Sequence, residues 1–149
     1  MNTTLKAFQY PKMLIKEYEN WCLLIRKKQV TLGSLVLICK ENATAFSDIS
    51  KGSSEELYII IKEIEKNLWE LYKNEKINYL MLMMVDPNVH YHIIPRFSKS
   101  INTLGRKFKD YSWPYAPDLT KHNEVDDKTL KNIKIQLKSK FLIPPKRKS

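Results

Sequence analysis

Two of the three histidines, His90 and His92, lie two residues apart in the segment 86–96. Apolar and aromatic residues stand between and after them, and Pro87 and Pro95 bracket the run, which is typical of a β-strand. Because side chains alternate along a strand, we expect both imidazoles on the same face. A neutral imidazole is a nucleophile and an acid or base near neutral pH, so this face fits phosphoryl or nucleotidyl transfer.

Other residues of the sequence could complete a phosphate-binding or metal-binding site with these histidines. Alternation places Asn88 on the same face, and Arg96 follows at the strand end, where a guanidinium can meet a phosphate or carboxylate. Metal binding is a second option, because His-x-His on a strand can present two ligands to one ion. That site would need further ligands, with His122, Asp86 and Asp110 as candidates. The plain alternative is that both histidines are ordinary half-buried strand residues.

The run from residue 88 to residue 96, Asn-Val-His-Tyr-His-Ile-Ile-Pro-Arg, resembles the signature of the histidine triad nucleotide hydrolases and transferases. That signature is His-φ-His-φ-His-φ-φ, where φ is apolar, and Pro-Arg commonly follows it. Segments 21–26 and 31–38 are similar to the family's strand, glycine-containing turn and strand. The resemblance covers roughly residues 14–118. It implies an α+β fold built on a five-stranded antiparallel sheet with helices, often as a homodimer.

The sequence departs from the family pattern in three places. The first triad position is Asn88 rather than histidine, and the position after the turn glycine is Ser34. The glycine- and glutamine-containing phosphate loop before the triad is missing, since residues 81–86 lead almost directly into it. The second and third triad positions are kept as His90 and His92. The central chemistry is therefore expected to survive, with altered substrate binding.

The resemblance implies a reaction at the α-phosphorus of a nucleotide conjugate, such as a phosphoramidate or a dinucleoside polyphosphate. His90 would become a nucleotidyl-histidine, and His92 would hold phosphate oxygens or assist proton transfer. Asn88, Ser34 and Arg96 are the predicted substrate-binding residues, and the scheme requires neither a metal nor a cofactor. Two alternatives stay open: a catalytically weak nucleotide-binding module, and a basic nucleic-acid-binding protein, including one that processes adenylated ends.

Length and composition narrow the class of protein. The 149 residues fit a single domain, and no apolar run reaches the ~18 residues that cross a bilayer. The N-terminus lacks the apolar stretch of a secretory signal. Cys22 and Cys39 lie in apolar, strand-like runs and are expected to be buried thiols. These features predict a cytoplasmic protein without a membrane segment.

The formal net charge is +10, from 26 Lys and Arg against 16 Asp and Glu. Such a charge attracts polyanions: nucleic acid, nucleotides or an acidic partner. Residues 128–149 contain eight basic residues and no acidic one, so much of the excess lies at this end. We expect a flexible basic tail at about residues 141–149. The plain alternative to polyanion binding is a solvated, lysine-rich tail.

The remaining pattern predicts the elements that position the histidines. Strands are expected over residues 14–18, 21–26, 34–40 and 77–85, and residues 1–13 are expected to form an arm with little regular structure. Methionines in the fourth of these strands are expected to pack in the core. Because this strand leads through a short link into the histidine strand, the two are predicted to be antiparallel neighbours.

Two helices complete the prediction. Ser53, as N-cap, and Glu56 form a predicted capping box that starts an amphipathic helix of about five turns over one sheet face. Asp126 or Asp127 is expected to cap a final helix that runs to about Lys140.

Overall fold

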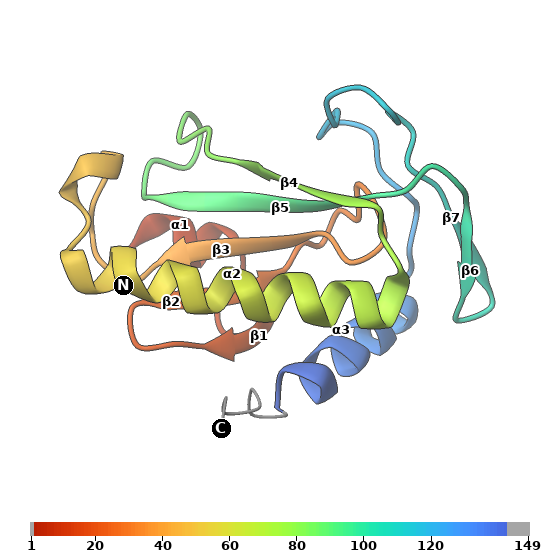
Figure 1. Cartoon of the computed structure of the whole chain (residues 1–149), viewed down its shortest axis with the longest axis horizontal. Helices are drawn as coiled ribbons and strands as arrows, with labels where there is room; N and C mark the ends of the chain where they lie inside the picture. Colours follow the sequence, from red (N-terminus) through yellow and green to blue (C-terminus); the bar gives the residue numbers. More distant parts are fainter. Residues whose placement is uncertain (1, 143–149) are drawn as a thin grey trace.

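The centre of the protein is a five-stranded antiparallel sheet with the strand order β1-β2-β3-β5-β4 (Figure 1). The computed structural model of the protein describes residues 2–142. The strands are β1 (Leu14–Glu17), β2 (Trp21–Ile25), β3 (Leu35–Cys39), β4 (Lys76–Leu80) and β5 (His90–Arg96), and a separate hairpin joins β6 (Ile101–Thr103) to β7 (Arg106–Phe108). The predicted α+β sheet with antiparallel β4 and β5 is confirmed.

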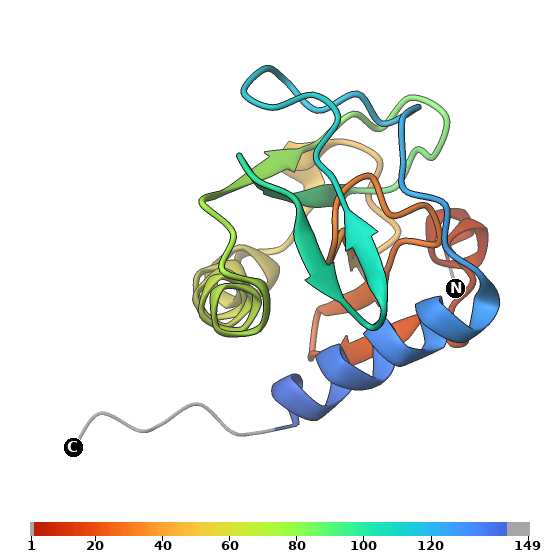
Figure 2. The same cartoon turned by 90° about the vertical axis from the view of Figure 1, so that its right-hand side faces the viewer.

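Helices cover both faces of this sheet. Within residues 2–142 they are α1 (Thr3–Ala7), α2 (Lys51–Tyr72) and α3 (Asp127–Phe141), with a 3-10 turn, η1, at Phe46–Asp48. Figures 1 and 2 show α2 along one face and α1 on the opposite face. The third helix, α3, packs beside the edge strand β1 and against α2. None of the described helices is long and apolar enough to span a membrane.

Strand β5 lies between β3 and β4, and its two faces differ in chemistry. In the register of the sheet, His92 stands opposite Val36 of β3 and Leu80 of β4. Because side chains alternate, Tyr91 and Ile93 point to the side of α2, whereas His90 and His92 point to the side of α1. The sheet thus separates an apolar face from the face that carries the imidazoles.

The long helix α2 begins three residues earlier than predicted. Its N-cap is Ser50, whose hydroxyl accepts the N–H of Ser53 at 3.1 Å. Glu56 does not cap the helix but accepts the backbone N–H of Asn20 at 2.8 Å. The predicted capping box is therefore wrong in its position, because Ser50 offers the same cap one turn upstream. With 22 residues, α2 makes about six turns rather than five.

The N-terminal segment is more regular than predicted. Residues 3–7 form α1, which starts at Asn2, where the side-chain oxygen accepts the N–H of Leu5 at 2.8 Å. The prediction of an arm with little regular structure is wrong for these residues. A five-residue helix is too short to be stable alone, so its formation reflects contacts with the rest of the protein.

The strand predicted over residues 77–85 is also shorter. It ends at Leu80, and residues 81–89 form an irregular connection to β5. Met81 and Met83 are partly buried and pack against the core as predicted, whereas Met84 is 86% exposed and Val85 92% exposed. An apolar run alone does not distinguish a buried strand from an exposed loop.

Several local predictions are confirmed. The carboxylate of Asp126 accepts the N–H of Thr129 at 2.8 Å and caps α3, which ends at Phe141. Cys22 and Cys39 are buried, unpaired thiols. Gly33 has a φ of +83°, and an added Cβ would lie 2.9 Å from the ring of Tyr72, so the turn before β3 requires glycine. Most of the predicted basic tail, residues 143–149, lies outside the described residues.

Candidate active site

His90 and His92 form the centre of the site. Their ring centroids are 5.0 Å apart, with an interplanar angle of 79°. The Nδ1 atom of His90 lies 2.6 Å from the backbone oxygen of Asn88. Because a carbonyl oxygen only accepts hydrogen bonds, Nδ1 carries the proton of the neutral ring. The lone pair of His90 therefore sits on Nε2, where it can act as a nucleophile.

His92 is held in its neutral form. Burial is the main cause that lowers its pKa, followed by the positive charge of Arg26 and then by His90, and together they bring the pKa to about 3. Its Nδ1 is buried and has no hydrogen-bond partner among the described residues. A neutral His92 offers one N–H and one lone pair, and an anion beside it would raise its pKa again.

Asn88, at the first triad position, ties α1 to the start of β5. Its side-chain oxygen accepts the backbone N–H of Thr4 at 3.2 Å and the hydroxyls of Thr4 and Thr3 at 3.1 and 3.3 Å. Its amide nitrogen donates to the side-chain oxygen of Asn42 at 3.1 Å. The amide of Asn88 is thus engaged with protein groups, and a substrate contact would require the exchange of one of these bonds.

The aromatic ring of Phe8, at the end of α1, covers the two histidines. Its centroid lies 5.8 Å from that of His90 and 5.9 Å from that of His92. His90 is only 1% exposed and His92 only 7% exposed. The ring of Phe8 and the low exposure of both histidines therefore restrict access to this pair of rings.

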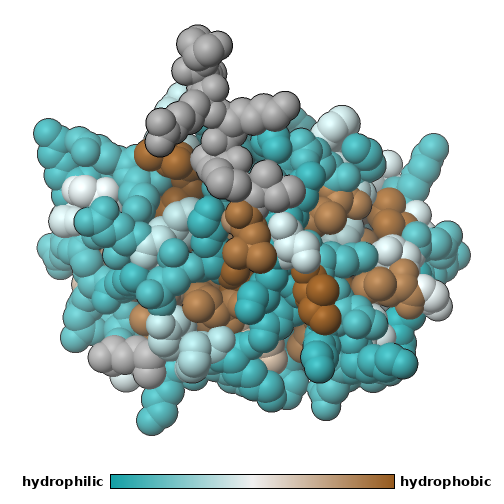
Figure 3. Space-filling model, turned by 90° about the horizontal axis from the view of Figure 1, so that it is seen from below, coloured by the Kyte–Doolittle hydropathy of each residue, from teal (hydrophilic) through white to brown (hydrophobic). Residues whose placement is uncertain are grey.

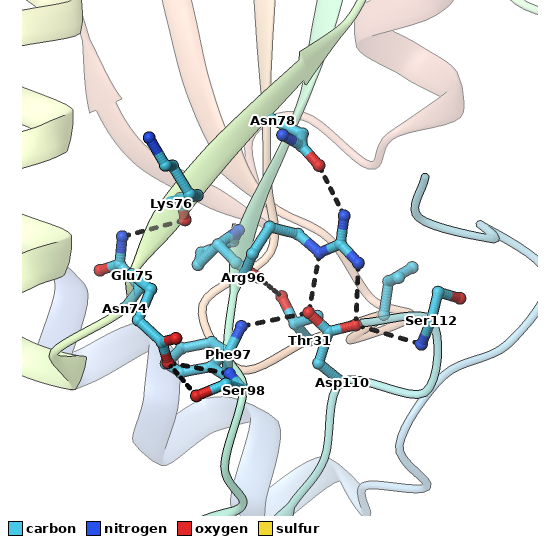
Figure 4. Close-up of polar contacts among 12 residues, drawn as sticks. Thr31, Asn74, Glu75, Lys76, Asn78, Arg96, Phe97, Ser98, Asp110 and Ser112 are labelled. Carbon is cyan, nitrogen blue, oxygen red and sulfur yellow. Dashed lines mark hydrogen bonds and ion pairs between the residues drawn. The ribbon is translucent and has the colours of Figure 1, made fainter. Parts of the chain in front are cut away.

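Arg96 has a different setting from the predicted phosphate contact (Figure 4). Its Nε donates to Asp110 at 2.7 Å and its Nη2 to the second oxygen of the same carboxylate at 3.2 Å, while Nη1 donates to Asn78 at 2.6 Å. Both partners of the ion pair are buried. This bidentate pair fixes the end of β5 to the chain after β7, so the guanidinium is occupied by the protein itself.

Ser34 is likewise engaged within the protein. Its hydroxyl donates to the backbone oxygen of Thr31 at 2.7 Å and accepts the N–H of Thr31 at 3.0 Å. The hydroxyl of Thr31 in turn donates to the backbone oxygen of Pro95 at 2.5 Å. The predicted pocket hydroxyl therefore closes the turn before β3 and links it to β5.

The additional metal ligands considered from the sequence are not gathered around the histidines. Asp110 is paired with Arg96, and Nδ1 of His122 lies 3.9 Å from a carboxylate oxygen of Glu124. Within residues 2–142 no three His, Cys, Asp or Glu side chains are grouped in a way that could hold a metal ion.

Arg26 joins the site although the sequence did not single it out. Arg26 follows β2 directly. Leu24 pairs with Val36, and Val36 pairs with His92, so these three side chains lie on the same face of the sheet. Because side chains alternate along the chain, Arg26 lies on that face too, which we call the histidine face because it carries His90 and His92. Its Nε and Nη1 atoms are buried without a hydrogen-bond partner in the described chain, and burial lowers its pKa. The sequence hides this role because residues 26–28 are all basic and are typical of a charged loop. The sequence did contain one signal: Arg26 lies two residues after Leu24 and four after Cys22, a spacing that places all three on the same face of a strand.

Comparison with known proteins identifies relatives of this architecture. No family model matches the sequence, and the search of curated proteins found no match. Among solved structures, a histidine triad protein from Bradyrhizobium japonicum has a TM-score of 0.73 and 21% identity, covering 94% of this chain and 96% of that chain. A histidine triad protein from Marinobacter aquaeolei has a TM-score of 0.72 and 17% identity, covering 94% and 93%. A hypothetical histidine triad nucleotide-binding protein from Sulfolobus tokodaii has a TM-score of 0.65 and 16% identity, covering 87% and 83%. At these identities the likeness concerns the fold.

Proposed function

We propose, from the histidine triad fold of this chain, that it is a nucleotide phosphohydrolase or nucleotidyl transferase that reacts at the α-phosphorus of a nucleotide conjugate. The observation that carries this proposal is the hydrogen bond of 2.6 Å from Nδ1 of His90 to the backbone of Asn88, because it leaves the nucleophilic lone pair on Nε2. The solved relative from Sulfolobus tokodaii, which is named as nucleotide-binding, adds support.

The reaction proceeds in two steps. The lone pair of His90 Nε2 forms a bond to the α-phosphorus, and the bond to the leaving group breaks with its electron pair going to the leaving atom. Water or another acceptor then attacks the same phosphorus, the phosphorus–nitrogen bond breaks, and His90 regains its lone pair. When water is the acceptor, its proton passes to solvent and the product is a nucleoside monophosphate.

His92 and Asn88 support these steps in different ways. The neutral His92 donates its N–H to an oxygen of the reacting phosphate, and the negative charge of that phosphate raises the pKa of His92 from its low value. Asn88 acts through its backbone oxygen, which orients the ring of His90. Its side-chain amide cannot act as an acid near neutral pH. The proton for the leaving group therefore comes from solvent, or from His92 after the bound phosphate has raised its pKa and the ring has taken up a second proton.

The experiment that tests the proposal is turnover of a nucleotide panel by the wild type and by His90→Ala. The panel contains an adenosine phosphoramidate, dinucleoside polyphosphates and an adenylated DNA end. His122→Ala is the matched control, because it removes a histidine outside β5. We expect nucleoside monophosphate release by the wild type and the control and none by His90→Ala. Equal release by all three proteins would exclude His90 as the nucleophile.

The same panel separates the enzyme from the nucleotide-binding module. A wild-type protein that binds nucleotides but releases no product from any panel member would favour the module. An α-labelled conjugate provides a second measurement, because a nucleotidyl-histidine carries the label on the protein. Label that appears on the wild type and not on His90→Ala would support the covalent step.

A group of lysines favours polyanion binding as a second candidate function. Lys134 has its pKa lowered by burial first and then by Lys138, Lys12 and Lys131, so these charges lie close together. A cavity of about 320 Å³ is lined in part by Lys12, Lys131 and Lys134. Figure 3 views the side of the molecule on which α3 lies, where hydrophilic residues surround smaller hydrophobic patches. These lysines form a defined positive surface to which a polyanion could bind.

Salt dependence tests this second candidate. We expect affinity for single-stranded DNA to fall steeply with salt, and the double variant Lys131→Gln/Lys134→Gln to flatten that dependence. The double variant Lys27→Gln/Lys28→Gln removes the same charge from exposed positions elsewhere. Similar binding by the two double variants would count against a site on α3. Truncation after residue 142 measures the contribution of the basic tail separately.

We also propose that the protein is a homodimer and works in the cytoplasm. The family resemblance supports the first of these, and the two free cysteines agree with a reducing compartment. Sedimentation equilibrium of the full chain tests the dimer, and a monomer at all concentrations would exclude it.

A further inference from the structure

Arg26 is half-buried and carries a positive charge that no acidic side chain of the described protein pairs with. Two of its three guanidinium nitrogens, Nε and Nη1, are buried and lack a hydrogen-bond partner within residues 2–142. Arg96 shows the contrast, since each of its guanidinium nitrogens donates to a protein oxygen. A buried charge without a partner destabilises a folded protein. A bound anion would supply the missing partner of Arg26.

The position of Arg26 connects this missing anion with the histidines. Its backbone N–H donates to Ser34 at 3.0 Å, so Arg26 lies one row of the sheet beyond the row that contains Val36 and His92. The charge of Arg26 lowers the pKa of His92, which places the two groups in the same electrostatic environment. The Nδ1 atom of His92 is a third buried polar atom without a partner. The order along this face is therefore His90, His92 and then Arg26.

The backbone around Arg26 is fixed by hydrogen bonds. The side-chain nitrogen of Gln29 donates to the carbonyl oxygens of Arg26 and Ser34 at 2.7 and 3.0 Å, and its side-chain oxygen accepts the N–H of Gly33 at 2.9 Å. The backbone of Gln29 is in turn held by Asn123. A guanidinium on such a rigid segment loses little freedom when it binds an anion, which favours binding.

We propose that Arg26, which follows His92 along this face, forms a subsite for a second phosphate, next to the phosphate that His90 attacks. This inference rests on the proposed function and makes it more specific: the substrates are conjugates with a polyphosphate leaving group, such as dinucleoside polyphosphates. When the bond from the α-phosphorus to the leaving oxygen breaks, its electron pair moves onto the leaving phosphate. Arg26 donates hydrogen bonds to that phosphate and stabilises the growing charge without forming a covalent bond. The amine leaving group of a simple phosphoramidate carries no phosphate to which Arg26 could donate a hydrogen bond.

The first test measures thermal unfolding with inorganic pyrophosphate as the probe, at constant ionic strength, for the wild type, Arg26→Gln and Lys28→Gln. Lys28→Gln is the matched control, because it removes the same charge from an exposed position two residues away. Pyrophosphate is expected to raise the Tm of the wild type and the control but not that of Arg26→Gln. Without pyrophosphate, Arg26→Gln is expected to be at least as stable as the wild type, because the variant loses a half-buried charge whose Nε and Nη1 atoms have no partner.

Two results of this test would overturn the subsite. A lower Tm for Arg26→Gln than for the wild type in the absence of pyrophosphate would indicate that Arg26 is a structural residue. An equal rise in Tm for Arg26→Gln and the wild type would show that pyrophosphate binds elsewhere.

The second test compares kcat/KM for two substrates that share the adenylyl group, diadenosine tetraphosphate and adenosine 5′-phosphoramidate. Arg26→Gln is expected to lower kcat/KM for the tetraphosphate by about 10- to 100-fold more than for the phosphoramidate, as for the loss of a charged hydrogen bond. Arg26→Lys, which keeps the charge, is expected to restore part of this loss. An equal loss for both substrates would overturn the assignment to the leaving group.

The two tests separate failure of the subsite from failure of the proposed function. If the wild type turns over neither substrate, the proposed function fails, and the pyrophosphate shift alone decides whether Arg26 binds phosphate. If the wild type turns over both substrates and Arg26→Gln has the same rates as the wild type, the proposed function stands and the subsite is rejected.

Discussion

The helices that pack on the two faces of the sheet differ in length and in the contacts that hold them. On one face, α2 is 22 residues long and buries an apolar stripe that includes Leu57, Ile60, Ile64 and Leu68. On the other face, α1 is five residues long and is held by the buried side chain of Leu5, by hydrogen bonds from its N-cap Asn2 to Cys39, and by hydrogen bonds to Asn88. Extended apolar packing makes a stable layer, whereas a short segment with few contacts opens at low free energy. We therefore expect α1 to detach from the histidine face more easily than α2 detaches from the opposite face.

The same contrast extends to the polar groups of the two faces. Four buried side-chain nitrogen or oxygen atoms in the described chain lack a partner, and three of them belong to Arg26 and His92 on the histidine face. On the opposite face the indole nitrogen of Trp21, a buried polar atom, donates to the backbone oxygen of Ser53 at 2.9 Å. Unsatisfied polar groups destabilise the fold, so their concentration on the histidine face supports the proposal that this face binds a ligand.

The largest expected effect distinguishes the buried Arg96 from the half-buried Arg26 on the histidine face. Arg96→Gln leaves the buried carboxylate of Asp110 without its ion-pair partner and is expected to lower the free energy of unfolding by about 3–5 kcal/mol. Arg26→Gln is the paired variant, for which no loss is expected. Urea denaturation of both variants measures the difference. Equal destabilisation would mean that Arg26 is also a structural residue.

The next prediction compares the two helical covers directly. Leu68→Ala in α2 removes a fully buried side chain and is expected to lower the free energy of unfolding by about 2–5 kcal/mol. Leu5→Ala in α1 is expected to have a smaller effect, because α1 can detach while the sheet and α2 stay folded. Urea denaturation followed by circular dichroism gives both values. A loss for Leu5→Ala as large as that for Leu68→Ala would show that α1 belongs to the same cooperative unit.

Asn88 provides a way to remove the cover without touching the histidines. Asn88→Ala deletes the acceptor of the hydrogen bonds from Thr3 and Thr4, and about 1–3 kcal/mol is expected to be lost from the attachment of α1. Amide hydrogen exchange of residues 3–8 is expected to become faster, and His90 is expected to react faster with an imidazole-modifying reagent. Asn42→Ala is the control, because it removes only the partner of the Asn88 amide nitrogen. Unchanged exchange in Asn88→Ala would contradict the assigned anchor.

The sequence predicted what depends on local pattern. The alternation of His90 and His92, the stripe of α2 and the cap at Asp126 are all properties of neighbouring residues, and the structure contains them. The sequence did not predict α1 or the ion pair of Arg96, because these depend on partners far apart in the chain: Thr4 bonds to Asn88 and Arg96 to Asp110. No local pattern encodes such pairs. The spacing of Arg26 gave its face but not its burial, which depends on how the chain closes over it.

The smallest expected effect is a pH dependence that belongs to His92 alone. Its pKa is about 3 in the folded protein and about 6.5 when it is fully exposed, so the unfolded chain binds more protons between these values. The contribution to stability is therefore complete above about pH 6.5 and is lost as the pH falls toward 3.

Urea denaturation at about pH 7 and about pH 4.5 measures this contribution. Many carboxylates also titrate in acid, so the informative quantity is the difference between the wild type and His92→Gln. The variant is expected to lose less stability on acidification, by on the order of 1 kcal/mol. His122→Gln serves as the control for removing a histidine elsewhere. If His92→Gln and the wild type had the same pH dependence of stability, His92 would not be held neutral by burial and Arg26. In that case the histidine face would differ from the α2 face in its cover but not in its electrostatics.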